Sequence, residues 1–159
     1  MNDIERQLAV HDLNARYVET IDEGRFEEWP GLFTDDGHYR VTTAENVEQG
    51  LPLSLIYATS RAMLQDRVRS LREANIYESQ RYRHVVGVPL LESAQDGATR
   101  ACTSFIIVRV MHSGESLVFA TGCYRDLIVK DASDGALRFA ERIVVLDSRQ
   151  IDTLLALPL

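Results

Sequence analysis

The sequence has little cysteine, almost no lysine and no long run of apolar residues. Its two cysteines, Cys102 and Cys123, are too few for a disulfide framework, and no CxxC pair occurs. No apolar run approaches the roughly 18 residues that a membrane-spanning helix needs, and the first residues lack the basic and apolar segments of a signal peptide. We therefore expect a cytoplasmic protein whose thiols stay reduced.

The sequence motifs of metal and nucleophile chemistry are also missing. The four histidines are separated by 27, 46 and 28 residues, so no HxH, HExxH or HxxxH pair exists. These histidines are His11, His38, His84 and His112. Neither cysteine has a histidine two or three positions further on, as an iron–sulfur centre of the Rieske type requires. No GxSxG, SxxK, phosphate-loop or dinucleotide motif occurs. The sequence therefore predicts no metal or cofactor site in this chain.

What the sequence does contain is the composition of one globular domain, residues 1–159. It is 45% hydrophobic and 26% charged, which excludes a disordered chain. The net charge is −7, and residues 1–60 hold 12 acidic against 4 basic side chains, which argues against a nucleic-acid partner. Sixteen of the 17 basic residues are arginine. This excess has two explanations, a GC-rich coding bias or the use of arginine at subunit interfaces.

The first segment with helical spacing covers residues 2–23. Its apolar residues recur every three or four positions and form one stripe, which we expect to face the core. The stripe consists of Ile4, Leu8, His11, Ala15 and Val18, with Val10 and Ile21 beside it. We expect the helix to end near Gly24, because glycine readily adopts the left-handed conformation that stops a helix.

Two further helices are expected in the first half of the chain. Residues 26–33 have the spacing of a short helix, although Pro30 weakens the pattern. Residues 60–75 carry an apolar stripe on one side and arginines on the other. Arg67 lies closer to the apolar side than the neighbouring arginines, so we expect it to have a carboxylate or carbonyl partner.

Beyond residue 80 the pattern changes to long β segments that are separated by Xaa-Gly turns. The predicted strands cover residues 81–93, 99–112, 116–130 and 136–147. Short turns between consecutive strands predict antiparallel pairing. A further strand at residues 38–43 follows a turn at residues 34–37, joins the same sheet, and precedes a loop through Asn46, Gly50 and Pro52. The predicted fold class is α+β, with three N-terminal helices packed on one face of a curved antiparallel sheet.

Two remaining features predict burial. Residues 154–159 are wholly apolar, so we expect this tail to be buried in the chain's own fold or against another chain. Cys102 and Cys123 lie in neighbouring predicted strands, where we expect them to face the core as small hydrophobic side chains.

A curved sheet covered by helices leaves a conical cavity, which suggests acid–base chemistry. Small isomerases and dehydratases of this architecture place an Asp, His or Tyr inside the cavity as a general acid or base. The candidates in this chain are Tyr17, Tyr39, His84 and Glu141. Each has a structural alternative, the tyrosines as core aromatics and the other two as partners of arginines. The arginines of residues 61–83 form a solvated face or a surface for a protein partner.

Four segments of the chain carry a family resemblance. They are Trp29–Val41, Asp66–Val68, Arg81–His84 and Phe139–Asp147. Here the sequence resembles the small (β) subunits of aromatic-ring-hydroxylating dioxygenases, and the likeness covers essentially the whole chain in order. The resemblance implies the cone-shaped fold of nuclear transport factor and ketosteroid isomerase.

The same resemblance implies a division of labour between subunits. In this family a large (α) subunit holds a Rieske 2Fe–2S cluster and a mononuclear Fe(II), and a separate NAD(P)H-dependent reductase supplies electrons. The small subunit is chiefly structural, supplies no catalytic residue, and is usually part of an α3β3 hetero-hexamer. The resemblance therefore implies no catalytic, cofactor or metal residue in this chain.

The family's recurring motif matches several residues of this chain. These residues are Arg83, His84, Glu141 and Arg142. We expect them, together with Arg67, to belong to structural or subunit-contact networks. Many relatives read Arg-His-x-x-Ser-Asn, whereas this chain has Gly87 and Val88 at the last two positions. A contact made by the Ser-Asn pair therefore cannot be carried over.

Within the family, two branches share features with this chain. Leu71–Glu78 and Asp152–Leu159 resemble the branch that acts on terephthalate, whereas Glu45–Leu53 resembles the branch that acts on salicylate. Both substrates are aromatic carboxylates, and the first branch is favoured. Two alternatives from other classes remain open, a stand-alone isomerase or dehydratase that uses its own cone, and a small-molecule binding protein of the same fold.

Overall fold

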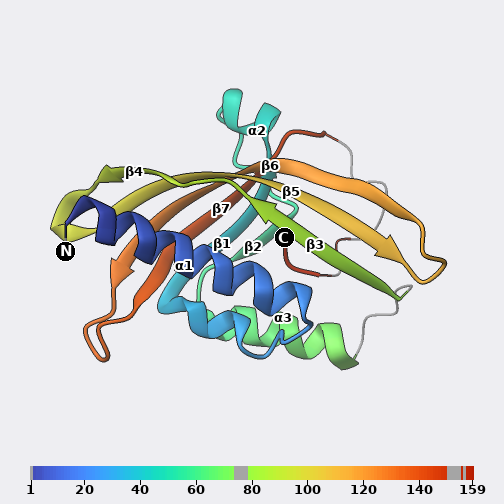
Figure 1. Cartoon of the computed structure of the whole chain (residues 1–159), viewed down its shortest axis with the longest axis horizontal. Helices are drawn as coiled ribbons and strands as arrows, with labels where there is room; N and C mark the ends of the chain where they lie inside the picture. The colour runs from blue at the N-terminus through green and yellow to red at the C-terminus, as the bar shows by residue number, and fades with distance from the viewer. Residues whose placement is uncertain (1, 74–78, 150–154, 156) are drawn as a thin grey trace.

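Seven strands form one curved sheet, and helices α1 and α3 lie along one of its faces (Figure 1). The structure is a computed structural model that describes residues 2–73, 79–149, 155 and 157–159. The strands arch over the two helices, and the short helix α2 projects on the other side (Figure 1). This arrangement confirms the predicted α+β class and the cone-shaped fold.

Helix α1 (Asp3–Asp22) confirms the first predicted helix. Asn2 caps it by accepting a 2.9 Å hydrogen bond from the Glu5 backbone N–H, while the Asn2 N–H donates to the Glu5 carboxylate at 2.8 Å. This reciprocal pair satisfies N–H groups that have no partner within the helix. Gly24, with φ of +70°, follows the last turn as expected.

The buried face of α1 differs from the predicted stripe. Ile4 and Leu8 are 74% and 65% exposed, and His11 is also exposed. The buried residues of this helix are Val10, Leu13, Asn14, Tyr17, Val18, Thr20, Ile21 and Asp22. The prediction is confirmed for Val10, Val18 and Ile21 and was wrong for Ile4, Leu8 and His11, because periodicity alone does not say which turns the rest of the fold covers. The first two turns bury no residue at all.

The other helices agree with the sequence in part. Helix α3 (Arg61–Glu73) confirms the predicted third helix as far as residue 73, and residues 74 and 75 lie outside the described residues. The predicted helix at 26–33 is instead the four-residue 3-10 helix η1 (Trp29–Leu32), which has Pro30 near its start. The predicted loop after residue 43 contains α2 (Ala44–Glu48). A 3-10 turn, η2 (Gln95–Gly97), lies before the longest strands.

The strands confirm most of the predicted β segments. They are β1 (Phe33–Thr43), β2 (Ile56–Ala58), β3 (Gln80–Val86), β4 (Leu90–Ser93), β5 (Thr99–Met111), β6 (Ser116–Lys130) and β7 (Leu137–Leu146). The predicted strand 81–93 is divided into β3 and β4, and both pair with β5. The expected turn at 34–37 lies within β1, where the register with β7 shifts between Phe33 and His38.

The sheet is mixed rather than wholly antiparallel. Its strand order is β2-β1-β7-β6-β5-β3, and β1 runs parallel to β7 while the other pairs are antiparallel. The prediction was wrong on this point because short turns determine direction only for consecutive strands. Between β1 and β7 the chain passes through helices and five strands, so local turns do not constrain that pair.

Strand β5 shows that the sheet has two different faces. Ala101, Thr103, Phe105 and Ile107 are buried, and the residues between them are exposed. Because side chains alternate along a strand, the first set defines an inner face toward the helices, and the second an outer face away from them. No helix of the described part of the chain is long and apolar enough to cross a membrane.

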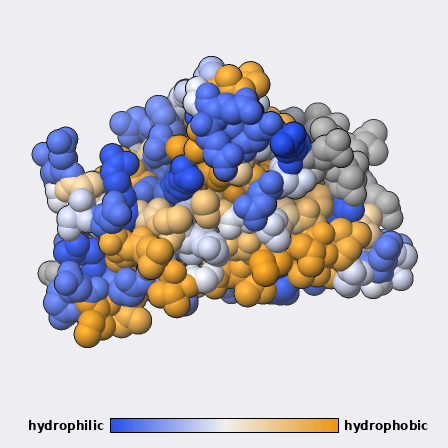
Figure 2. All heavy atoms as spheres, turned by 90° about the horizontal axis from the view of Figure 1, so that it is seen from above, coloured by the Kyte–Doolittle hydropathy of each residue, from blue (hydrophilic) through white to orange (hydrophobic). Residues whose placement is uncertain are grey.

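The cysteines lie on the outer face. Cys102 is exposed and Cys123 is half-buried, so the prediction that they face the core was wrong. Each alternates with residues that do face the core, such as Thr103 and Tyr124. Seen from above, this side of the molecule shows patches of hydrophobic residues among hydrophilic ones (Figure 2).

Candidate functional site

A buried ion pair lies at the centre of the cone. Arg142 of β7 donates from Nε to Asp126 Oδ1 at 2.9 Å and from Nη2 to Asp126 Oδ2 at 2.7 Å, and both side chains are fully buried. The same Nη2 donates to Asn14 Oδ1 from α1, and Asn14 donates to Thr103 Oγ1 of β5 at 3.1 Å. The network therefore joins α1 to three neighbouring strands of the sheet.

Aromatic rings surround the Arg142 guanidinium. Its central carbon lies 4.1 Å from the ring centres of Tyr17 and Tyr124 and 3.9 Å from that of Phe139. Ring faces attract a desolvated cation, so they help to offset the cost of burying it. Burial lowers the pKa of Arg142, but the Asp126 carboxylate outweighs this and the net shift is upward. The guanidinium is thus held charged inside an aromatic cage.

The apolar tail fills the inside of the cone beside this cage. Leu157 and Leu159 are 4% and 0% exposed, which confirms the predicted burial for the described part of the tail. Tyr17 and Tyr39 both donate from their hydroxyls to the main-chain oxygen of Leu159, at 2.6 and 3.2 Å. Burial raises the pKa of both tyrosines, so both hydroxyls stay protonated as donors.

A second buried pair lies at the end of α1. His84 Nδ1 lies 2.5 Å from Asp22 Oδ1, and the His84 backbone N–H donates to Asp22 Oδ2 at 2.9 Å. Because a carboxylate only accepts hydrogen bonds, the ring proton is placed on Nδ1. His84 Nε2 is buried and has no hydrogen-bond partner among the described residues. The pair has the arrangement of a histidine base oriented by an acid.

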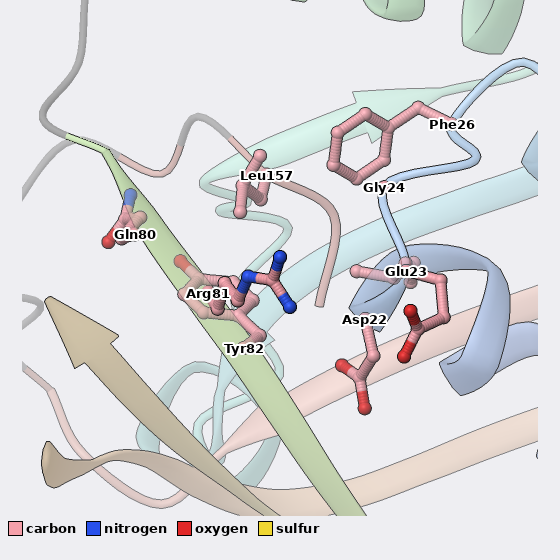
Figure 3. Close-up of a pocket in the computed structure, with 9 residues that line it drawn as sticks. Asp22, Glu23, Gly24, Phe26, Gln80, Arg81, Tyr82 and Leu157 are labelled. Atoms are coloured by element: carbon pink, nitrogen blue, oxygen red, sulfur yellow. The ribbon is translucent and has the colours of Figure 1, made fainter. Parts of the chain in front are cut away.

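A pocket of about 210 Å³ opens beside this pair. Figure 3 shows Asp22 and Glu23 on one side of it and Gln80, Arg81 and Tyr82 of β3 on the other. One wall is the acidic end of α1, with Asp22 and Glu23, and the wall formed by β3 carries Arg81. The pocket therefore offers charged groups of both signs to a polar ligand.

No metal-ligand group is formed by the described residues. Nowhere in that part of the chain do three His, Cys, Asp or Glu side chains come close enough to hold one ion. The acidic side chain that contacts His84 is Asp22, and the cysteines lie on the opposite face of the sheet. The donor set does not fit an iron–sulfur cluster or a mononuclear iron.

Comparison with known proteins identifies the family. The SnoaL-like domain family matches residues 2–143. The β1 subunit of the terminal oxygenase component of terephthalate 1,2-dioxygenase from a Comamonas species is 46% identical over 153 residues, which is 96% of this chain and 98% of that one. The chain belongs to the small (β) subunits of aromatic-ring-hydroxylating dioxygenases.

Other small subunits agree with this assignment. The anthranilate 1,2-dioxygenase small subunit from Burkholderia cepacia is 36% identical over 99% of this chain and 96% of its own. A crystal structure of a β subunit attributed to an aromatic-ring-hydroxylating dioxygenase of Novosphingobium aromaticivorans superposes with a TM-score of 0.86 at 36% identity, covering 97% of each chain. The agreement extends over the whole fold of this small subunit.

The predicted site residues of this small subunit are distributed over different surroundings. His84 and Arg142 are buried inside the cone, in separate pairs. Arg83 is 60% exposed at the sheet edge and lies 3.5 Å from Glu23. Glu141 is half-buried on the outer face, where it lies beside His38 in the neighbouring strand. Glu141 therefore does not join Tyr17, Tyr39 and His84 in the interior.

Arg67 lacks the predicted partner. No carboxylate or carbonyl of the described residues accepts a hydrogen bond from it, although it is half-buried. Arg67 lines a very small cavity together with Trp29 and Pro158. Burial raises the pKa of Tyr39, and the nearby positive charge of Arg67 opposes this shift. A guanidinium can keep its charged end hydrated while its stem is buried, which explains the missing partner.

The sequence analysis did not find three parts of this interior. These are Asp126, Asn14 and the contact of Leu159 with two tyrosines. Asp126 did carry a signal, because it occupies an inward position of a strand between Tyr124 and Ile128. An acidic residue at such a position requires a cationic or hydrogen-bonding partner.

Proposed function

We propose that this chain is the structural, non-catalytic small subunit of a Rieske-type dioxygenase complex that acts on an aromatic carboxylate, with terephthalate as the first candidate. The observation that carries the proposal is the 46% identity to a terephthalate 1,2-dioxygenase β subunit over 96% of the chain. In the proposed reaction, both atoms of O₂ enter the ring as a cis-dihydrodiol, and two electrons come from NAD(P)H through a separate reductase.

The proposal assigns the iron centres to the large (α) subunit. The Rieske 2Fe–2S cluster and the mononuclear Fe(II) would be held there, in a cytoplasmic α3β3 complex. The donor set of this chain supports that assignment, since its described residues bring no three metal-binding side chains together. The contribution of this chain would be to position the large subunits relative to one another.

The contents of the cone support a non-catalytic role. A stand-alone acid–base enzyme of this fold needs free hydroxyls or carboxyls inside its cavity. Here Tyr17 and Tyr39 are both hydrogen-bonded to Leu159, and Asp126 is paired with Arg142. One observation favours the alternative, because the Asp22–His84 pair leaves His84 Nε2 without a partner among the described residues.

Co-expression with the large subunit tests the proposal. We expect the two chains to copurify as a brown complex that, with a reductase and NAD(P)H, converts terephthalate to a cis-dihydrodiol. Salicylate serves as the competing substrate, and its preferred oxidation would move the chain to the other branch. A colourless protein that ignores the large subunit and turns over or binds small ketones or hydroxy compounds would overturn the proposal in favour of the stand-alone enzyme.

A further inference from the structure

We infer that the outer face of β3, β5 and β6 is the surface that binds the large subunit. The inference rests on the proposed function, and it adds which face of the chain makes the contact. The surface is defined by an apolar group, called the outer strip, and by two arginines beside it. The outer strip consists of Val85, Leu90, Ile106 and Val118, and the arginines are Arg100 and Arg125.

The strand register places the members of the outer strip on one face. Val85 of β3 lies directly opposite Ile106 of β5, and Val118 of β6 lies opposite the half-buried Val108. Directly opposite residues of paired strands point to the same side of a sheet. Val85, Ile106 and Val118 are 58%, 44% and 63% exposed. They form a continuous apolar surface that no element of the described chain covers.

Leu90 extends the strip toward the sheet edge. It is 74% exposed and lies opposite Cys102, which in turn lies opposite Arg125 on β6. Beside them, a groove of about 740 Å³ is lined by Arg100, Leu127 and Val129 and by residues between Ser93 and Ala98, among them Asp96. The strip thus passes from β6 across β5 to β4 and ends at a hollow that can take a side chain of a partner.

The charge of this face is opposite to that of the whole chain. The net charge is −7, yet the charged residues that point outward from β3, β5 and β6 are arginines. These residues are Arg81, Arg83, Arg100 and Arg125. The carboxylates near them are Glu92 of β4, opposite Arg100, and Asp96 in the groove. Arg125 is exposed, and no carboxylate of the described residues lies within ion-pair distance of it. The face therefore fits an apolar surface that carries carboxylates.

Surface area also indicates a covered face. A monomer of 18.0 kDa is expected to expose about 8,000 Å². This chain exposes 9000 Å², which is on the order of 1,000 Å² more. A stable protein interface removes about 800 Å² from each partner. The surplus is thus of the size that one such interface would cover.

A second copy of this chain fits the face less well than the large subunit does. In a two-fold dimer the same patch lies on both sides, so the four outward arginines of one copy would meet those of the other. Like charges brought together at an interface disfavour it. A different chain with carboxylates around an apolar patch meets no such repulsion, and arginine is enriched in the cores of interfaces of that kind.

The experiment compares two charge reversals in binding to the large (α) subunit that is co-expressed with this chain. Arg125→Glu changes the outer face, whereas Arg69→Glu changes an arginine of α3 that is 67% exposed on the helix side. We expect Arg125→Glu to weaken binding on the order of 30-fold or more, because its carboxylate would repel the carboxylates expected on the large subunit. Arg69→Glu should bind like the unchanged chain. Melting curves of both isolated variants establish that each is folded.

A thiol readout locates the contact independently of mutation. Cys102 is exposed and lies opposite Arg125. We expect it to react with N-ethylmaleimide in the isolated chain and to lose this reactivity in the complex.

Three results separate this inference from the proposed function. If the unchanged chain does not bind the large subunit, both are overturned. If it binds while Arg125→Glu binds equally well and Cys102 stays reactive, only the inference is overturned. The third result is an isolated chain that forms a dimer, which Arg125→Glu converts to a monomer without weakening the large-subunit complex. That result would assign the outer face to a second copy of this chain and would overturn the inference as well.

Discussion

The two faces of the sheet differ in the burial and ion pairing of their arginines. On the inner face, Arg142 is fully buried, paired with Asp126 through two hydrogen bonds and enclosed by three aromatic rings. On the outer face, Arg125 is exposed and has no ion-pair partner among the described residues. The interior guanidinium thus has its counter-charge within the chain, whereas the exterior one is left to solvent or to another protein.

This difference places residues that affect folding stability on the inner face and residues available for association with a partner on the outer face. Removal of the interior arginine should destabilise the isolated chain, since it leaves a buried carboxylate without its counter-charge. Exterior arginine contributes little to folding, because solvent screens it, and it remains available for association. Substitutions on the two faces should therefore separate stability from binding.

The largest expected effect is on the buried ion pair. Arg142→Met leaves the Asp126 carboxylate buried without its counter-charge, so we expect the free energy of unfolding to fall by about 3–5 kcal/mol. Urea denaturation of the isolated chain measures it. The matched control is Arg125→Met on the outer face, which should change stability by less than about 0.5 kcal/mol. Equal losses for the two variants would remove the distinction between the faces.

A double variant sharpens the interpretation of this result. Arg142→Met combined with Asp126→Leu removes both charges, and apolar residues of similar size replace them. We expect the double variant to be more stable than Arg142→Met alone, because the uncompensated carboxylate is gone. A double variant that is less stable than the single one would show that Asp126 has a role apart from its partner.

The next largest effect concerns the apolar tail. Leu159 is fully buried inside the cone, whereas Leu90 is 74% exposed on the outer strip. We expect Leu159→Ala to lower the free energy of unfolding by about 2–5 kcal/mol through lost burial and a new cavity. Leu90→Ala should leave it within about 0.5 kcal/mol. Thermal and urea unfolding of both variants test this, and a stable Leu159→Ala would mean that the tail is not part of the core.

A smaller effect is expected for one inner hydroxyl. Tyr17→Phe removes the 2.6 Å hydrogen bond to the Leu159 oxygen, while Tyr39 still donates to the same atom. We expect a loss of about 1 kcal/mol, the usual net value of such a bond. Tyr57→Phe changes a ring that is 58% exposed and serves as the control, with no measurable change. If both variants unfold at the same urea concentration, the tail is held by apolar contacts alone.

Local patterns in the sequence determined the strands well. The predicted segments 99–112 and 116–130 agree with β5 and β6 within one residue. The reason is that Gly114 and Gly135, with φ of +87° and +74°, occupy tight turns that only glycine adopts without strain. Alternation between these turns then fixes which residues point inward.

Long-range contacts could not be predicted in the same way. Arg142 and Asn14 are 128 positions apart, and their hydrogen bond depends on how α1 crosses the sheet. The parallel pairing of β1 with β7 likewise depends on the path of the whole chain. Part of the buried face of α1 was missed for this reason, since Asn14 is covered only because two distant side chains satisfy its amide.

The smallest expected effect compares two arginine–carboxylate pairs of the same geometry. Arg72 holds Glu27 through contacts of 2.7 and 3.0 Å, as Arg142 holds Asp126, but the Glu27 side chain is 62% exposed. The hydrogen bond from Arg72 lowers the pKa of Glu27 from 4.5 to about 2. Because solvent screens this pair, we expect Glu27→Gln to cost less than about 1 kcal/mol at pH 7.

The pH dependence of this pair has a definite sign. A carboxylate whose pKa is depressed in the folded state stabilises the fold above its unfolded pKa and loses that effect as the pH falls through the folded value. The stability difference between the unchanged chain and Glu27→Gln should therefore be constant above about pH 5 and vanish toward pH 2. Glu28→Gln, which removes an exposed carboxylate 3.4 Å from Arg25, is the matched control. Melting temperatures of both variants and of the unchanged chain between pH 2 and 7 measure these differences. A difference for Glu27→Gln that persists at low pH would show that Glu27 stabilises the fold through packing rather than through its charge, in contrast to Asp126 in the buried pair.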